Sequence, residues 1–599
     1  MKTKIIILLG SVLALFSGCS KYLDAYPNGD RSTEEIFQYQ DLVQGLVGQC
    51  YDNMSRNYDN DEGVYFDCAS DDGVSTTPTR ATRRMAVGSL TTGSDPFSTY
   101  WTRDYNSIRL VNLFLKDRRG YNTKFIVNPV WDNLVRNRLQ GEAFALRAWF
   151  HWDLLQKFGG KGITSGKMLG IPLILEPVDF LNNVNFARNT YDECVKQIIA
   201  DCDSAYKYLP IAHRDFLVPN ASDRVYAGGR YWGKMDGITT RAIKSNVYLT
   251  WASPRFNPGN DMSRYDSAAM NAKKVIDFKL KVDNVAGGFN PANAVNWFDP
   301  NSPEIVISAR YQGSNDAMER IFYPGGFQGN GAVGATQELV NTFPMANGYP
   351  ITDPRSNYDK NNPYLNRDPR FYSNIFYNTV QAKKNNTGVL MYTFETWVNG
   401  GKDAAGVKST NSLTNYHVKK NVYMGLNWSD ASISRTSHTK MFIRWTHMVL
   451  NFAEAANKVV GPTDAARYGL SAKAAIQYLR TRKSYDGATL WTVANDLYLN
   501  EVSADAAKFD SFVRDERRIE TCFEGMRFYD IQRWSTTLAA MNNPVHKSEA
   551  TKNADGSFTY DLTKEAEGRA YKSAYLPIPY VEILRMSKLE QNEGWDGWK

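Results

Sequence analysis

Apolar residues recur at helical spacing near both ends of the chain. Over residues 130–158, Leu146, Phe150 and Leu154 fall on one face of a helix, and Gly159 follows as a natural stop. The same spacing of three and four residues predicts further helices over residues 32–54, 98–116, 190–209, 239–252, 265–278, 441–459 and 464–483. The chain is therefore predicted to be mostly α-helical.

Small residues stand among the large rings on these helices. Ala143, Ala145 and Ala148 alternate with tryptophan and other bulky side chains, which is typical of antiparallel helices that pack closely in pairs. Tetratricopeptide arrays are built in this way, although no strict repeat of about 34 residues is visible here. The pattern predicts a scaffold of helix pairs over residues 30–280 and 441–599.

Helical spacing nearly vanishes between residues 281 and 440. This insert is rich in glycine, asparagine, proline and aromatic residues, and only residues 304–311 (EIVISARY) have the composition of a strand. The remainder is predicted to form long loops. Long loops on a rigid scaffold usually carry function, so the insert is the expected binding surface. Residues 19–599 are expected to form a single domain that includes it.

The N-terminal segment has the features of a bacterial lipoprotein signal. Lys2 and Lys4 precede an apolar run, residues 5–16, which is too short to span a bilayer and is followed by Ser-Gly-Cys. Residues 1–18 are expected to be removed, and Cys19 is expected to carry a lipid. A plain secretory signal that contains a cysteine is the alternative. No later segment is long and apolar enough to predict a transmembrane helix.

Composition and charge narrow the function further. The chain has 599 residues, of which 43% are hydrophobic and 22% charged, with a formal net charge of +7. So mild a charge, without a lysine or arginine run, gives no support to nucleic-acid binding. The cysteines other than Cys19 include no CxxC and are expected to be buried thiols, and the histidines show no metal-ligand spacing. These residues predict no transition-metal site and no cofactor.

The segment RDERRIETCFEGMRFYDIQRW, residues 514–534, carries paired carboxylates among arginines. Glu516 and Glu520 are one helical turn apart, a spacing at which two carboxylates could act as a retaining glycosidase pair. The alternative is an ion-pair network, because Phe512 and Phe523 share the same predicted helical face and would bury these carboxylates. We predict the network and no catalytic residue. Its predicted members are Glu516, Arg517, Glu520, Glu524, Arg527 and Arg533.

Several segments, taken together and in order, resemble the SusD/RagB family of glycan-binding lipoproteins from Bacteroidetes outer membranes. The segments are RLQGEAFALRAWFHWDLLQKFGG (138–160), ATQELVNTFPMANGYPI (335–351), MFIRWTHMVLNFAEAANK (441–458), RDERRIETCFEGMRFYDIQRW (514–534) and YLPIPYVEILRMSKLEQNEGW (575–595). They span nearly the whole chain that would follow Cys19. The resemblance implies tetratricopeptide-like helix pairs and a variable, loop-rich region that recognises ligand.

The resemblance also implies a function without catalysis. A family member is a lipoprotein on the outside of the outer membrane, where it caps a SusC-like TonB-dependent transporter that imports oligosaccharides. Binding and delivery of an oligosaccharide or polysaccharide are therefore expected. Members of the RagB branch handle peptides, so a peptide ligand is the first alternative. A surface glycoside hydrolase and a scaffold that binds only protein partners are the others.

The resemblance places the ligand at the loop after the first helix, the start of the next helix and the middle loops. In this sequence those places hold Asp71, Asp72, Arg80, Trp101, Trp297, Phe298, Tyr311, Phe322 and Tyr323. Sugars bind by stacking on such rings while polar side chains satisfy their hydroxyls. Asp71 and Asp72 could instead ligate calcium, and the sequence leaves that choice open.

Overall fold

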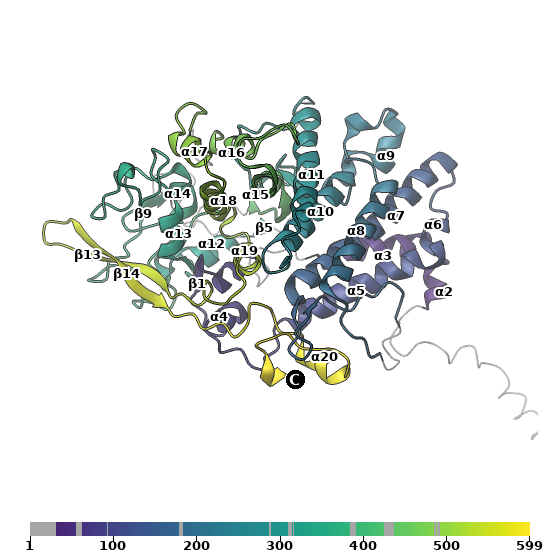
Figure 1. The fold of residues 1–599 in the computed structure, drawn as a ribbon, viewed down its shortest axis with the longest axis horizontal. Coiled ribbons are helices and arrows are strands. Elements are labelled where there is room, and N and C mark those ends of the chain that lie inside the picture. The colour runs from purple at the N-terminus through teal and green to yellow at the C-terminus, as the bar shows by residue number, and fades with distance from the viewer. Residues whose placement is uncertain are drawn as a thin grey trace, which may run out of the picture.

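The computed structural model describes residues 32–54, 63–92, 94–178, 184–286, 289–309, 314–315, 317–383, 391–424, 436–483, 487 and 491–598. The predicted signal segment, the predicted lipid site Cys19 and the predicted ligand residue Tyr311 lie outside these residues. Figure 1 shows helix pairs on the right, the insert on the left, and the later helices α15 to α19 between them.

The scaffold is an array of helices that pack in chain order. Its main helices are α2 (Thr33–Ile36), α3 (Gln40–Asn53), α5 (Ser98–Leu115), α7 (Pro129–Phe158), α8 (Tyr191–Tyr208), α10 (Gly237–Ala252), α11 (Met262–Phe278), α15 (Trp445–Val460), α16 (Ala472–Arg480) and α18 (Ala506–Thr521). From α3 to α11 each packs on the next, α11 packs on α15, and α15 packs on α16 and α18. The predicted mostly helical scaffold is confirmed.

Small residues on α7 let its neighbours approach closely. Ala143 and Ala145 are fully buried, and a Cβ atom added at Gly141 would lie 2.5 Å from the Leu209 side chain that follows α8. The helix begins at the Asn128 side chain, which caps its first turn, and ends at Gly159 as predicted. Close packing of such helix pairs builds the larger hydrophobic core.

Two predicted helices are shorter than their patterns indicated. Residues 441–444 form strand β12 (Met441–Arg444), which pairs with β4 (Ile305–Ser308), so α15 begins only at Trp445. Residues 464–471 form turns, because Gly461 at φ 84° ends α15 and the Ser471 side chain caps α16. The pattern over 32–54 is likewise divided into α2 and α3.

The insert contains short strands and helices around its own core. Strand β4 confirms the predicted strand. The other strand pairs of the described chain are β1 (Gly73–Ser75) with β6 (Val333–Ala335), β2 (Gly160–Lys161) with β3 (Met168–Leu169), β5 (Ser314–Asn315) with β11 (Thr436–Ser437), β7 (Ile375–Phe376) with β10 (His417–Val418), and β8 (Gln381–Lys383) with β9 (Met391–Thr393). A second hydrophobic cluster lies mostly within this region, and Tyr65, Cys68, Ile519 and Phe523 from outside the insert also belong to it.

A long hairpin interrupts the part of the scaffold that was predicted to be helical. Strands β13 (Val545–Lys552) and β14 (Phe558–Glu567) pair antiparallel and extend past the insert (Figure 1). The shorter helices of the described chain are α4 (Ala81–Ala86), α6 (Arg119–Asn122), α9 (Arg224–Ala227), α12 (Ala317–Phe322), α13 (Gln337–Thr342), α14 (Pro369–Asn374), α17 (Leu497–Val502), α19 (Arg527–Trp534) and α20 (Tyr580–Arg585).

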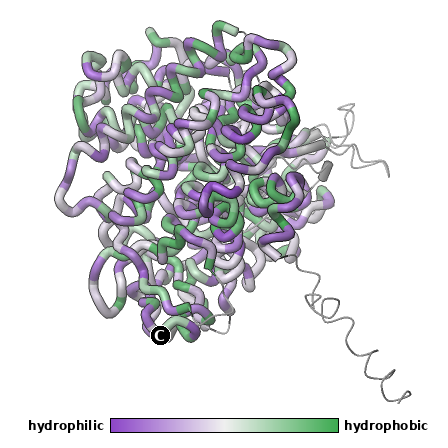
Figure 2. The backbone as a smooth tube through the Cα atoms, turned by 90° about the vertical axis from the view of Figure 1, so that its right-hand side faces the viewer, coloured by the Kyte–Doolittle hydropathy of each residue, from purple (hydrophilic) through white to green (hydrophobic). Residues whose placement is uncertain are grey.

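Hydrophilic and hydrophobic positions alternate over short distances along the tube in Figure 2. This alternation is expected for helices that bury one face and expose the other. Among the described residues, the structure has no helix whose length and apolar character would let it cross a membrane.

Candidate functional site

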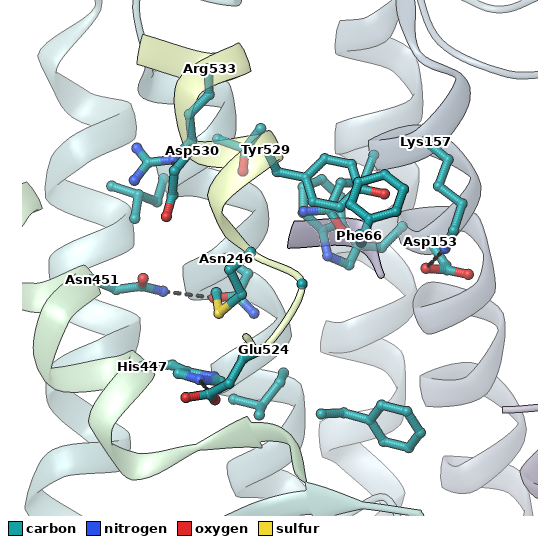
Figure 3. A pocket seen from close by; sticks show the side chains of 18 of the residues that line it. Phe66, Asp153, Lys157, Asn246, His447, Asn451, Glu524, Tyr529, Asp530 and Arg533 are labelled. Carbon is teal, nitrogen blue, oxygen red and sulfur yellow. Dashed lines mark hydrogen bonds and ion pairs between the residues drawn. The ribbon is translucent and has the colours of Figure 1, made fainter. Parts of the chain in front are cut away.

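A cavity of about 170 Å³ lies where the helix pairs meet the later helices, and we call it the central pocket. It is lined from α5, α7, α10, β12, α15, the turn between α18 and α19, and α19 itself. Figure 3 shows Asp153 and Lys157 on one side, His447 and Asn451 on the other, and Tyr529 and Asp530 above Glu524. Segments that are distant in sequence therefore build one hollow.

Aromatic rings form much of the wall of the central pocket. Trp149 on α7 meets Phe442 of β12 edge to face, with ring centroids 5.3 Å apart. Phe66 and Tyr529 stack at 5.0 Å. Trp149, Phe442 and Tyr529 are half-buried, so their rings remain available to a ligand.

Neutral polar groups in the same pocket are left without partners. Within the described part of the chain, the Gln156 amide, the Thr250 hydroxyl and the Trp149 indole N–H make no hydrogen bond. Asn246 accepts one from Asn451 at 2.7 Å through its oxygen, which leaves its own N–H groups. These donors and acceptors, set among rings, suit a ligand that has both apolar faces and hydroxyls.

The charged groups of the pocket neutralise one another. Asp153 accepts hydrogen bonds from Lys157 and, at 2.8 Å, from Arg103, which also contacts Asp104. Burial, together with the neighbouring Asp153 carboxylate, raises the pKa of Asp104 well above its ordinary value. The wall near α7 therefore presents a paired group and not an isolated charge.

Glu524 is the carboxylate on the opposite wall. It accepts hydrogen bonds from Arg444 at 2.8 Å, Lys420 at 2.7 Å and His447 Nε2 at 3.0 Å. Burial raises its pKa, but these three groups outweigh the burial and hold the pKa well below its usual range. Burial also lowers the pKa of His447, so the imidazole is neutral and donates from Nε2. Neither group is poised to transfer a proton at neutral pH.

Glu516 and Glu520 of α18 lie in a buried ion-pair network. Arg370 bonds both carboxylates, at 2.8 Å and 2.9 Å, while Arg480 bonds Glu516 at 2.5 Å and Arg482 bonds Glu520. Burial raises the pKa of Glu516, but Arg370 and Arg480 outweigh it and hold the pKa at about 2. A carboxyl that stays ionised cannot serve as a general acid, so the pair lacks the property that glycoside hydrolysis needs.

The other predicted network members are also paired. Arg533 binds Glu454 through two bonds of 2.6 Å, Arg517 binds Asp530 at 2.7 Å, and Arg527 binds Asp71 at 2.8 Å.

The helix around these residues ends earlier than its pattern indicated. It stops at Thr521, so the predicted position of Phe523 on the same helical face is wrong. Phe523 adopts φ 59° and Gly525 adopts φ 76°, and the turn they form directs Glu524 into the central pocket.

The structure holds Asp71 and Asp72 against arginines. Arg527 lies 2.8 Å from Asp71, Arg518 lies 2.6 Å from Asp72, and Asp72 is 0% exposed. Two guanidinium groups supply the positive charge that a calcium ion would supply, so these carboxylates do not fit a calcium site.

The remaining predicted ligand residues are spread over separate places. Trp101 is 4% exposed and lines a groove of about 250 Å³ with Tyr105 and Phe186, beside α20. Trp297 is 7% exposed and lines a small cavity near Arg444. These two tryptophans therefore do not share one surface.

Four further predicted residues lie in or near the core of the insert. Phe322 and Tyr323 are buried there. Phe298 packs edge to face on Tyr423 and on His438. Arg80 lies over the Tyr65 ring at 3.7 Å, just before α4. The structure does not bring the predicted ligand residues that it describes together into one site.

The sequence did carry a signal for the central pocket. Trp149, Trp152 and Gln156 recur every three or four residues on α7, on a different face from Leu146, Phe150 and Leu154. From the sequence alone, the tryptophans of this helix indicate only close packing between helices. Phe442 and Glu524, which line the same pocket, are both hundreds of residues away along the chain, and no local pattern joins them to this stripe.

These features first define a class: a helix-pair scaffold of the tetratricopeptide type, with an insert and a ring-lined pocket. The family comparisons then identify it. A family model described as the SusD family matches residues 294–595, and one described as starch-binding, associating with outer membrane, matches residues 21–226. The chain belongs to the SusD family.

Individual relatives agree with this assignment. A SusD-like protein of Formosa agariphila is 21% identical over 544 residues, which cover 88% of this chain and 90% of that protein. A SusD-like protein from Bacteroides fragilis has a solved structure that superposes with a TM-score of 0.68 at 22% identity, covering 94% of this chain and 98% of that one. A structure described as a SusD-like carbohydrate binding protein, also from B. fragilis, gives a TM-score of 0.66 at 17% identity over 93% and 100%.

Proposed function

We propose that this protein binds an oligosaccharide or polysaccharide at the cell surface and delivers it to a SusC-like TonB-dependent transporter, without cleaving it. The main support for this proposal is the central pocket, which combines half-buried rings with neutral polar groups that have no partner among the described residues. Membership of the SusD family, and the matching model described as starch-binding and associating with the outer membrane, support the same role. A lipid on Cys19 would hold the chain to that membrane.

The chemistry of the pocket fits a sugar unit. The C–H face of a pyranose stacks on Trp149 or Phe442, while its hydroxyls bond with Gln156, Thr250 and Asn246. The cavity is smaller than the roughly 300–1,000 Å³ that is usual for drug-sized ligands, so it holds one unit or a chain end. The rest of a longer glycan would extend over the surface.

The absence of catalysis belongs to this proposal and has a physical reason. The paired carboxylates Glu516 and Glu520 are each bonded by two arginines, and Glu524 is bonded by three basic groups. Ionised and fully engaged carboxylates provide neither the acid nor the free nucleophile of a glycosidase.

Isothermal titration of the purified protein against a panel of oligosaccharides and mixed peptides tests the proposal. We expect saturable binding of at least one glycan, with no new reducing ends in the same sample. Binding of peptides alone would assign the protein a peptide ligand, and release of reducing sugar would make it an enzyme. Either result would overturn the proposal.

A further inference from the structure

A second hollow, of about 60 Å³, includes Arg444 at the junction between β12 and α15 in its wall, and we call it the Trp297 cavity. Its lining residues are Val295, Trp297, Arg370, Ser373, Asn374, Lys420, Arg444, Arg482, Lys483, Ile519 and Glu520. Arginine and lysine therefore dominate its polar wall, and a single carboxylate, Glu520, stands among them. Trp297 was predicted to contact a sugar, but the family descriptions assign no anion to this cavity.

Both oxygens of the single carboxylate in the wall are already engaged by arginines. One Glu520 oxygen accepts from Arg370 at 2.9 Å and the other accepts from Arg482. Burial raises the pKa of Glu520, but Arg482 and Arg370 outweigh it, so the pKa is lowered and the group stays ionised. The other acidic partners of these cations, among them Glu516 and Glu524, do not line the cavity.

Several hydrogen-bond donors at the cavity are unsatisfied. Arg444 is 1% exposed, and its Nη1 makes no hydrogen bond within the described chain; the nearest carboxylate oxygen, on Glu304, is 3.6 Å away. The Asn374 amide, the Trp297 indole N–H and the Lys483 ammonium also have no partner among the described residues. A buried donor without an acceptor costs about 1–3 kcal/mol, and more when the donor is charged.

A hollow lined mainly by cations, with more spare donors than spare acceptors, favours a ligand that is anionic and accepts hydrogen bonds. We propose that the Trp297 cavity binds one small anion: a halide, or a single carboxylate or sulfate group. Lys483 supplies the charge, and Arg444 Nη1, Trp297 and Asn374 supply donors. Lys420 and Arg444 already lie 5.2 Å from the Trp297 ring centre, so the ring also holds the cations in place.

The size of the cavity limits the ligand. Since one water needs roughly 10–15 Å³ by this measure, about 60 Å³ admits a cluster of about four waters or one compact anionic group. Two sources supply such a group: a free ion from the medium, or the acidic substituent of a sugar that reaches in past the exposed Lys483. The proposal itself does not depend on the proposed function; only the second source does.

Titration calorimetry in low-salt buffer tests the site with sodium acetate, sodium chloride and sodium sulfate as probes. We expect saturable one-to-one binding of at least one of them. Lys483→Ala should weaken it about fivefold, or ~1 kcal/mol. Lys483 is exposed and has no ion-pair partner among the described residues, so we expect its loss to leave the fold intact. Trp297→Phe should also weaken anion binding, because it removes the indole N–H donor while keeping an aromatic ring at this position. Lys207→Ala removes an equally exposed lysine from α8 and should change nothing.

Glucuronate and glucose form the second arm of the experiment. Glucuronate that competes with acetate, while glucose does not, would identify an acidic sugar as the source; acetate binding without glucuronate competition would identify a free ion. No saturable binding of any probe, or equal binding in the wild type and both cavity variants, would overturn the proposal. These outcomes are independent of glycan binding in the central pocket, which Trp149 and Gln156 would report.

Discussion

Trp149 carries the largest ligand-facing ring of the central pocket. Among the described residues its indole makes one ring contact, an edge-to-face contact with Phe442, and its N–H has no partner. We predict that Trp149→Ala lowers glycan affinity about tenfold, because it removes a stacking surface worth about 1.4 kcal/mol. Trp397→Ala, which removes a half-buried ring from the insert, is the matched control for titration calorimetry. Equal affinities in both variants would move the binding site elsewhere.

Glu520 is expected to stabilise the fold and not to bind the glycan, because its carboxylate bonds arginines and does not line the central pocket. We predict that Glu520→Gln leaves glycan affinity unchanged and lowers the free energy of unfolding by about 3 kcal/mol, since Arg370 and Arg482 would lose the charge that pairs with them. Denaturant unfolding gives the stability and calorimetry the affinity. Lost affinity at unchanged stability would return α18 to consideration as a functional helix.

At the scale of elements, the turn between α18 and α19 links the network to the pocket. Gly525 adopts φ 76°, a conformation that costs an alanine about 1–2 kcal/mol, and its N–H donates to Asp67 at 2.8 Å. Gly525→Ala should lose that much stability and also weaken glycan binding, because Glu524 and Met526 beside it line the central pocket.

Gly556 provides the control for that substitution. It has φ 85° at the tip of the β13–β14 hairpin, with nothing near enough to meet an added Cβ atom. Gly556→Ala should lose similar stability without any change in affinity. An unchanged affinity in the Gly525 variant as well would show that the turn does not shape the binding site.

Elements with local signals were predictable from the sequence. The stripe on α7 and its terminal Gly159 need only residues within a few turns. Strand β12 was not predictable from local sequence, because Met441 is extended through its pairing with the distant Ser308. The place of Glu524 in the central pocket was not predictable either, because its side chain is directed by a turn with positive φ. The ligand residues implied by resemblance were mostly placed apart, since their positions depend on insert packing that the sequence does not encode locally.

At the scale of the whole molecule, buried ion pairs make the free energy of unfolding fall as the pH is lowered. The folded pKa of Glu516, about 2, lies below its ordinary 4.5, as does that of Glu454, where Arg533 outweighs the opposing effect of burial. Groups of this kind stabilise the fold above pH 4.5 and lose that contribution as pH falls toward 2, at about 3 kcal/mol each.

This loss of stability in acid should reduce the difference in unfolding free energy between the wild type and the Glu516→Gln variant. Denaturant unfolding between pH 7 and pH 3 should show wild-type stability falling toward that of Glu516→Gln, whose neutral side chain has no such proton to take up. Parallel curves, with a constant gap between wild type and variant across this range, would contradict the assigned pKa.

We propose above that the ring-lined central pocket binds a glycan without cleaving it. The most direct measurement is a crystal structure of the protein with an oligosaccharide that it binds in titration. We expect a sugar ring stacked on Trp149, with hydroxyls bonded to Gln156 or Thr250 and every glycosidic bond intact. A sugar bound only elsewhere with the central pocket empty, or a cleaved product beside Glu524, would contradict it.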